Sequence, residues 1–126
     1  MELSLGEVVD KVTILLLKEK HLSQPEALVN VRRELKTLRE AWEKAGFEPM
    51  ETLADWHGLC DVNSALWQGE DDLRDCEREK SFGPKFVQLA RSVYHLNDRR
   101  ACLKRSINTT LGSRLIEEKS YADYTS

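Results

Sequence analysis

The sequence has no long apolar run and few cysteines. Its longest aliphatic run is Ile14 to Leu17, far short of the about 20 residues that cross a bilayer. Its first residues lack the basic stretch and small-residue cleavage site of a secretory signal. The 3 cysteines form no C-x-x-C pair and are odd in number, which favours a reducing compartment over a disulfide framework. The sequence therefore predicts a cytoplasmic protein that does not enter the membrane.

A strong charge of one sign is lacking too. The 126 residues include 19 basic and 22 acidic ones, with a net charge of −3, so no overall positive field attracts nucleic acid or anionic lipid. The signatures of phosphate loops, dinucleotide folds, esterases and zincins are absent. We expect no nucleic-acid partner, no metal and no cofactor.

Three weak sequence patterns would each indicate a metal site or an enzyme active site. His57 and Cys60 are one helical turn apart, a spacing that zinc sites use, but no further ligand is evident. An E-x-x-E at Glu40 and a D-x-x-D at Asp72 loosely resemble the magnesium sites of helical pyrophosphohydrolases, although surface acids explain them better. The start of the chain is slightly similar to helical chorismate mutases, but its basic residues do not match that family.

Helical spacing of apolar residues covers most of the chain. An S-x-x-E at Ser4 predicts a helix from about Leu5 to His21, and a second S-x-x-E at Ser23 predicts one that ends at Gly46. The next helix should span about 50–80 and the last one 84–112, each about 40 Å long. Residues 113–126 have no strong period and are expected to form a less regular tail.

These elements predict one all-α domain over residues 1–126. It is a four-helix domain with two short N-terminal helices packed on a long antiparallel helical hairpin, followed by the C-terminal tail. Counting back from a reversal near Phe82 sets Trp67 level with Asn97 and Cys60 with Lys104, to within about one turn.

Each long helix carries a second, more polar stripe beside its apolar one. The stripe on the third helix is Trp56, Cys60, Asn63, Trp67, Glu70, Arg74 and Glu77. The stripe on the fourth helix is Val87, Ala90, Tyr94, Asn97, Ala101, Lys104 and Asn108. Facing each other, the two stripes would form a polar seam, in which each unpaired buried group costs about 1 to 3 kcal/mol. The seam should therefore be hydrogen-bonded internally or occupied by a ligand.

Charge also differs between the long helices. The segment from Glu70 to Glu77 holds five acids and Arg74, whereas the segment from Arg91 to Arg105 holds five bases and Asp98. We expect these tracts to neutralise each other across the hairpin or between subunits. Alternatively, the basic helix binds a phosphate or carboxylate ligand, for which arginine is a two-pronged donor.

Four separated motifs resemble one uncharacterised bacterial all-α family, a domain of unknown function. They are S-x-G-E-x-x-D-K from Ser4, N-x-x-L-W-x-x-E-D-x-x-R from Asn63, V-Y-x-x-N-D-R-R from Val93 and G-S-x-x-x-E-E-K-S-Y from Gly112. The resemblance covers nearly the whole chain and implies no activity. It implies a link to surface-polysaccharide biosynthesis and a shared set of polar residues.

Together the stripes and the resemblance define a candidate polar pocket. Its members are Glu7, Asp10, Lys11, Asn63, Trp67, Glu70, Asp71, Arg74, Tyr94, Asn97, Asp98, Arg99, Arg100, Lys104, Lys119 and Tyr121. Our leading hypothesis is a noncatalytic accessory module that self-associates, as a dimer, or binds another protein. The alternative is an enzyme or binder of a small anionic metabolite, a nucleotide sugar or sugar phosphate.

Overall fold

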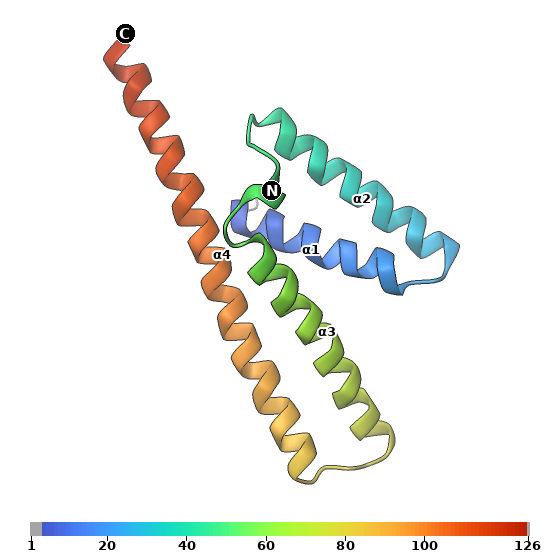
Figure 1. Cartoon of the computed structure of the whole chain (residues 1–126). Helices are drawn as coiled ribbons and strands as arrows, with labels where there is room; N and C mark the ends of the chain where they lie inside the picture. The colour runs from blue at the N-terminus through green and yellow to red at the C-terminus, as the bar shows by residue number, and fades with distance from the viewer. Residues whose placement is uncertain (1–3, 126) are drawn as a thin grey trace.

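The computed structural model describes the backbone of residues 4–125 and the side chains of residues 4–112. Its elements are α1 (Leu5–His21), α2 (Pro25–Lys44), the 3-10 helix η1 (Met50–Thr52), α3 (Trp56–Arg78) and α4 (Pro84–Thr125). The described backbone contains no strand. α1 and α2 form one antiparallel hairpin, and α3 and α4 form a longer one (Figure 1). The all-α class with a long helical hairpin is confirmed.

α1 is the central element of the fold because it contacts α2, α3 and α4. Val9 and Val12 are completely buried, and Leu15 is nearly so. α2 lies on α1 and buries Val31 and Leu35 along one stripe. Of the two N-terminal helices, α1 packs directly on the hairpin as predicted, whereas α2 packs on α1.

The two capping boxes predicted from sequence have different outcomes. Ser4 caps α1, since its hydroxyl accepts a hydrogen bond from the backbone N–H of Glu7 at 3.3 Å. The box at Ser23 is not used, because Gln24 is the N-cap residue of α2 and makes no side-chain cap bond. Pro25 opens that helix instead, with a backbone angle already suited to a first turn.

The third helix begins later than predicted, at Trp56 rather than near Met50. The preceding segment is held against the end of α2. Trp42 stacks on Phe47 with ring centres 4.8 Å apart, and its indole N–H donates to the carbonyl of Glu48 at 2.7 Å. Met50 is 1% exposed. The chain must turn here to bury these side chains, so a continuous helix cannot form.

The fourth helix continues beyond Gly112, where the sequence predicts its end, and the segment expected to be a less regular tail is helical to Thr125. Gly46, after α2, has a positive φ of 86°, whereas Gly112 does not have a positive φ. A single glycine inside a helix costs about 1 kcal/mol, which its neighbours can offset. This end of α4 projects past α1 and α2 (Figure 1).

The register of the hairpin agrees with the count from sequence to within one turn. A Cβ atom added at Gly58 would lie 3.4 Å from the Leu103 side chain, and one added at Gly69 would lie 3.2 Å from Val93. α3 and α4 therefore approach closely at these two glycines. α1 crosses both helices at their polar stripes, through Asn63 on α3 and through Lys104 and Asn108 on α4.

Candidate functional site

Asp10 of α1 lies at the centre of the polar seam. Its side chain is almost fully buried, and its carboxylate joins both long helices. Oδ1 accepts hydrogen bonds from Nδ2 of Asn63 on α3 and from Nε of Arg100 on α4, each at 2.9 Å. Oδ2 accepts from Nη2 of Arg100 at 2.5 Å. This two-pronged pair ties α1 to α4.

Thr13 completes the network one turn further along α1. Asn63 donates a hydrogen bond to its hydroxyl oxygen at 2.8 Å, and the hydroxyl donates to the backbone carbonyl of Asp10 at 2.7 Å. Among the described side chains, every buried nitrogen and oxygen has a hydrogen-bond partner. The buried polar atoms of Asp10, Thr13 and Asn63 therefore satisfy one another and Arg100 within a closed network.

A second set of contacts joins the start of α1 to α4. Nζ of Lys104 lies 2.5 Å from Oε1 of Glu7, and the backbone N–H of Gly6 donates to Oδ1 of Asn108 at 2.7 Å. A Cβ atom at Gly6 would overlap the carbonyl oxygen of Lys104. Only glycine lets the two backbones approach this closely.

The electrostatics of the seam keep Asp10 ionised. Burial raises the pKa of its carboxyl. The hydrogen bonds from Arg100 and Asn63, together with the positive charges of Arg100 and Lys104, lower the pKa by a larger amount, so it lies below its ordinary value. The hydrogen bond to Asp10 likewise raises the pKa of Arg100, against the effect of burial. The pair is a stable internal ion pair at neutral pH.

The structure brings together only part of the candidate pocket. Glu7, Asp10, Asn63, Arg100 and Lys104 meet around α1. Trp67 borders this group and stacks on His21, at the end of α1, with ring centres 5.1 Å apart.

The other candidates lie outside the buried group. Lys11 turns to α2, where it pairs with Glu34 at 2.8 Å. Arg74 pairs with Asp71 along α3 at 2.7 Å. The exposed candidates are Glu70, Tyr94, Asn97, Asp98 and Arg99. The side chains of Lys119 and Tyr121 lie outside the described ones.

Three residues of the closed network, Gly6, Thr13 and Asn108, are missing from the candidate pocket. Thr13 follows Asp10 by three residues in an otherwise apolar stretch, so the two share one face of the helix. Gly6 stands in a first helical turn, where glycine is costly unless a close approach requires it. The sequence therefore contains a signal for Thr13 and another for Gly6.

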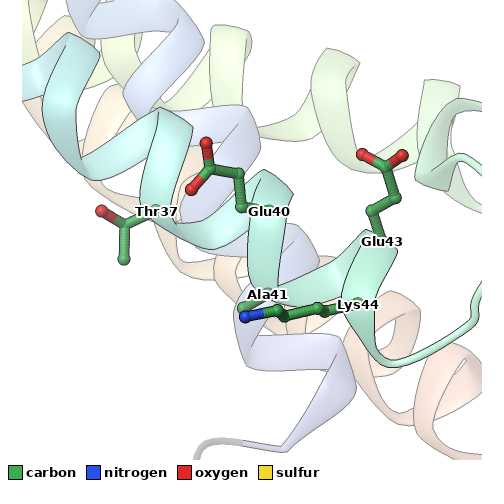
Figure 2. A pocket seen from close by; sticks show the side chains of 5 residues that line it. All are labelled: Thr37, Glu40, Ala41, Glu43 and Lys44. Carbon is green, nitrogen blue, oxygen red and sulfur yellow. The ribbon is translucent and has the colours of Figure 1, made fainter.

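Surface hollows occur elsewhere on the described side chains, some lined by a single helix and others by several elements. One is lined by Thr37, Glu40, Ala41, Glu43 and Lys44, all from the last turns of α2 (Figure 2). It is therefore an indentation along a single helix, with acidic and basic side chains spread over it rather than converging on one point. Most small-molecule sites are concave and lined by several elements.

The described residues contain neither a cluster of metal-ligating side chains nor a membrane-spanning helix. No three His, Cys, Asp or Glu side chains there lie close enough to hold a metal ion. None of the described helices has the length and apolar character needed to cross a membrane.

Comparison with known proteins gives one match. A model described as a family of unknown function, DUF6165, matches residues 1–126. The chain belongs to this family. The expected membership of an uncharacterised family is confirmed, while the bacterial origin and the four motifs stay predictions for DUF6165. No curated protein and no solved structure matches the chain.

Proposed function

We propose that the chain is a noncatalytic helical module that self-associates as a dimer and serves as an adaptor or accessory subunit. The observation that carries this proposal is the contrast between the two halves of the polar seam. The half around Asp10 is filled by α1 and closed by hydrogen bonds. The other half, toward the turn of the α3–α4 hairpin, is exposed.

Large apolar side chains near that turn support an interaction role. Phe82 is 51% exposed, Val87 53% and Tyr94 69%. They lie in the connection to α4 and in its first turns, where α3 and α4 extend beyond α1 (Figure 1). Exposed apolar groups that gather on one element are typical of protein interaction surfaces.

The geometry favours this role over binding of a nucleotide sugar or sugar phosphate. An anionic ligand would need free cations, but Arg100 is bound to Asp10 and Lys104 to Glu7. Arg74 is bound to Asp71. A ligand held by Arg100 or Lys104 would have to displace α1, which leaves Arg99, exposed and without an ion pair among the described side chains, as a cation outside the buried group. The link to surface-polysaccharide biosynthesis and the cytoplasmic location stay predictions.

Light scattering on a size-exclusion column tests the proposal. We expect a dimer at micromolar concentration that dissociates on dilution, with an unchanged far-ultraviolet circular dichroism spectrum. A monomer at every accessible concentration would overturn self-association. Native mass spectrometry of gently purified protein is the companion measurement, since a retained small molecule would instead support the metabolite alternative.

A further inference from the structure

The exposed half of the seam continues the face of the α3–α4 hairpin that α1 covers. We call the half covered by α1 the upper seam: Asn63 and Trp67 on α3, with Lys104 and Asn108 on α4. The lower seam is Glu70, Arg74 and Glu77 on α3, with Val87, Ala90, Tyr94 and Asn97 on α4; all seven are exposed. Alternate spacings of three and four residues place each stripe on one helix face.

The cover ends where α1 ends. His21, its last residue, stacks on Trp67, the last upper-seam residue of α3. Beyond this level, α3 and α4 run on together to their turn, as Figure 1 shows. The face of the hairpin that receives one helix in its upper half is thus open to a second helix in its lower half.

The two sides of the lower seam specify the chemistry of that second helix. The α4 side presents Val87 and Tyr94, one heptad apart. The α3 side presents Glu70 and Glu77, which make no ion pair with any described side chain, whereas Arg74 is held by Asp71. This exposed face therefore fits a helix with an apolar stripe flanked by a basic side chain.

The first turns of α4 have this chemistry themselves. Beside Val87 and Tyr94 lies Arg91, which is exposed and forms no ion pair with the described part of the chain. The acidic tract of α3 and the basic tract of α4 also form no ion pair with each other among the described side chains. Arg100 and Lys104 of the basic tract are paired with α1, whereas Arg91, Glu70 and Glu77 have no ion-pair partner among the described side chains and are available to a second subunit.

Resting on the proposed self-association, we propose that the lower seam binds α4 of a second copy of this chain. Val87 and Tyr94 of the two copies pack together, and Arg91 of each copy faces Glu70 and Glu77 of the other. A surface that complements itself in this way generates a two-fold dimer.

The position of α1 decides the direction of pairing. α1 covers the upper seam on the same face of the hairpin in each copy. A parallel arrangement would set the two α1 helices against each other. An antiparallel arrangement puts them at opposite ends, so that the turn of each hairpin lies near the end of α1 in the other copy.

A charge exchange between two variants tests this pairing. The double variant Glu70→Lys/Glu77→Lys makes both sides of the contact basic, and Arg91→Glu makes both sides acidic. We expect each variant alone to raise the dimer Kd about tenfold, since weakened pairing and new repulsion occur twice per dimer. An equimolar mixture should recover the wild-type Kd as a heterodimer, because both contacts again join opposite charges.

A matched pair of variants tests the apolar part of the surface. Val29 on α2 is 53% exposed, the same as Val87. Val87→Asp should raise the dimer Kd at least as much as the charge variants, whereas Val29→Asp should leave it unchanged. Circular dichroism of each variant verifies that the helices remain folded.

The outcomes separate this inference from the proposed function. If wild-type protein is a monomer, both fail. If wild-type protein is a dimer and the charge variants and Val87→Asp have the same dimer Kd, self-association stands and the lower seam is the wrong surface. If each charge variant is a monomer but the mixture does not associate, the pairing of Arg91 with Glu70 and Glu77 is wrong.

Discussion

Asp10 and Arg100, 90 residues apart in the sequence, form a two-pronged ion pair with distances of 2.9 and 2.5 Å. Asp10 has 2% of its side chain exposed and Arg100 29%, so the pair lies at the inner edge of the bundle. It fixes where α1 crosses the hairpin. Since α1 also carries α2, this pair positions both N-terminal helices.

Removing the carboxylate should therefore destabilise the protein. Asp10→Ala leaves Arg100 without its acceptor and removes one of the two acceptors of Asn63, and we expect a loss of about 2 to 4 kcal/mol in the free energy of unfolding. Urea denaturation followed by circular dichroism measures this loss. Arg74→Ala, which breaks the exposed pair with Asp71, is the control and should change stability little. Equal losses in both variants would contradict a special role for Asp10.

The lowered pKa of Asp10 predicts a dependence of stability on pH. An unfolded aspartate has a pKa of about 3.9, so on acidification the unfolded chain takes up this proton first. The contribution of Asp10 is fully present above that pH and is lost as the pH falls through the lower pKa of the folded state. The stability difference between wild type and Asp10→Asn, measured by denaturation across this range, should shrink on acidification. A difference independent of pH would refute the ion pair as its source.

Two glycine substitutions should change the stability of the folded protein in opposite directions. Gly6→Ala forces a methyl group onto the Lys104 carbonyl, and we expect a loss of about 1 to 3 kcal/mol from overpacking. Nothing lies within 4 Å of a Cβ atom at Gly112, so Gly112→Ala should stabilise α4 by about 0.5 to 1 kcal/mol. Thermal denaturation measures both. Stabilisation by Gly6→Ala would contradict the close packing of α1 on α4.

The three cysteines should react with iodoacetamide in a fixed order. Cys102 is exposed and Cys76 is buried. Burial, with the nearby negative charges of Asp61 and Glu51, raises the pKa of Cys60 and so lowers its thiolate fraction. Mass spectrometry over time should show Cys102 modified first, Cys60 slowly and Cys76 only in unfolded protein. Early modification of Cys76 would show that its packing between α3 and α4 opens readily.

Local patterns predicted the helices well. The range of α1 is the predicted one, and Ser4 caps it, because a cap and a helical period depend only on residues a few positions apart. The same local rules failed at two helix ends, the start of α3 and the predicted end of α4. The start of α3 is displaced by the packing of Trp42 on Phe47 and of Met50 in the core. Gly112 did not end α4, since glycine stops a helix only where the backbone turns left-handed.

The sequence by itself determined the class of the fold, the hairpin and the two polar stripes, because helical periodicity sets which residues share a face. The tertiary structure decided what those stripes do. Asp10 enters the seam because the close approach at Gly6 lets α1 cross α4. This crossing pairs Arg100 with Asp10 and Lys104 with Glu7. The lower seam is exposed because α1 ends at His21, which stacks on Trp67. Where a helix crosses its neighbours depends on packing between distant residues, which no local pattern specifies.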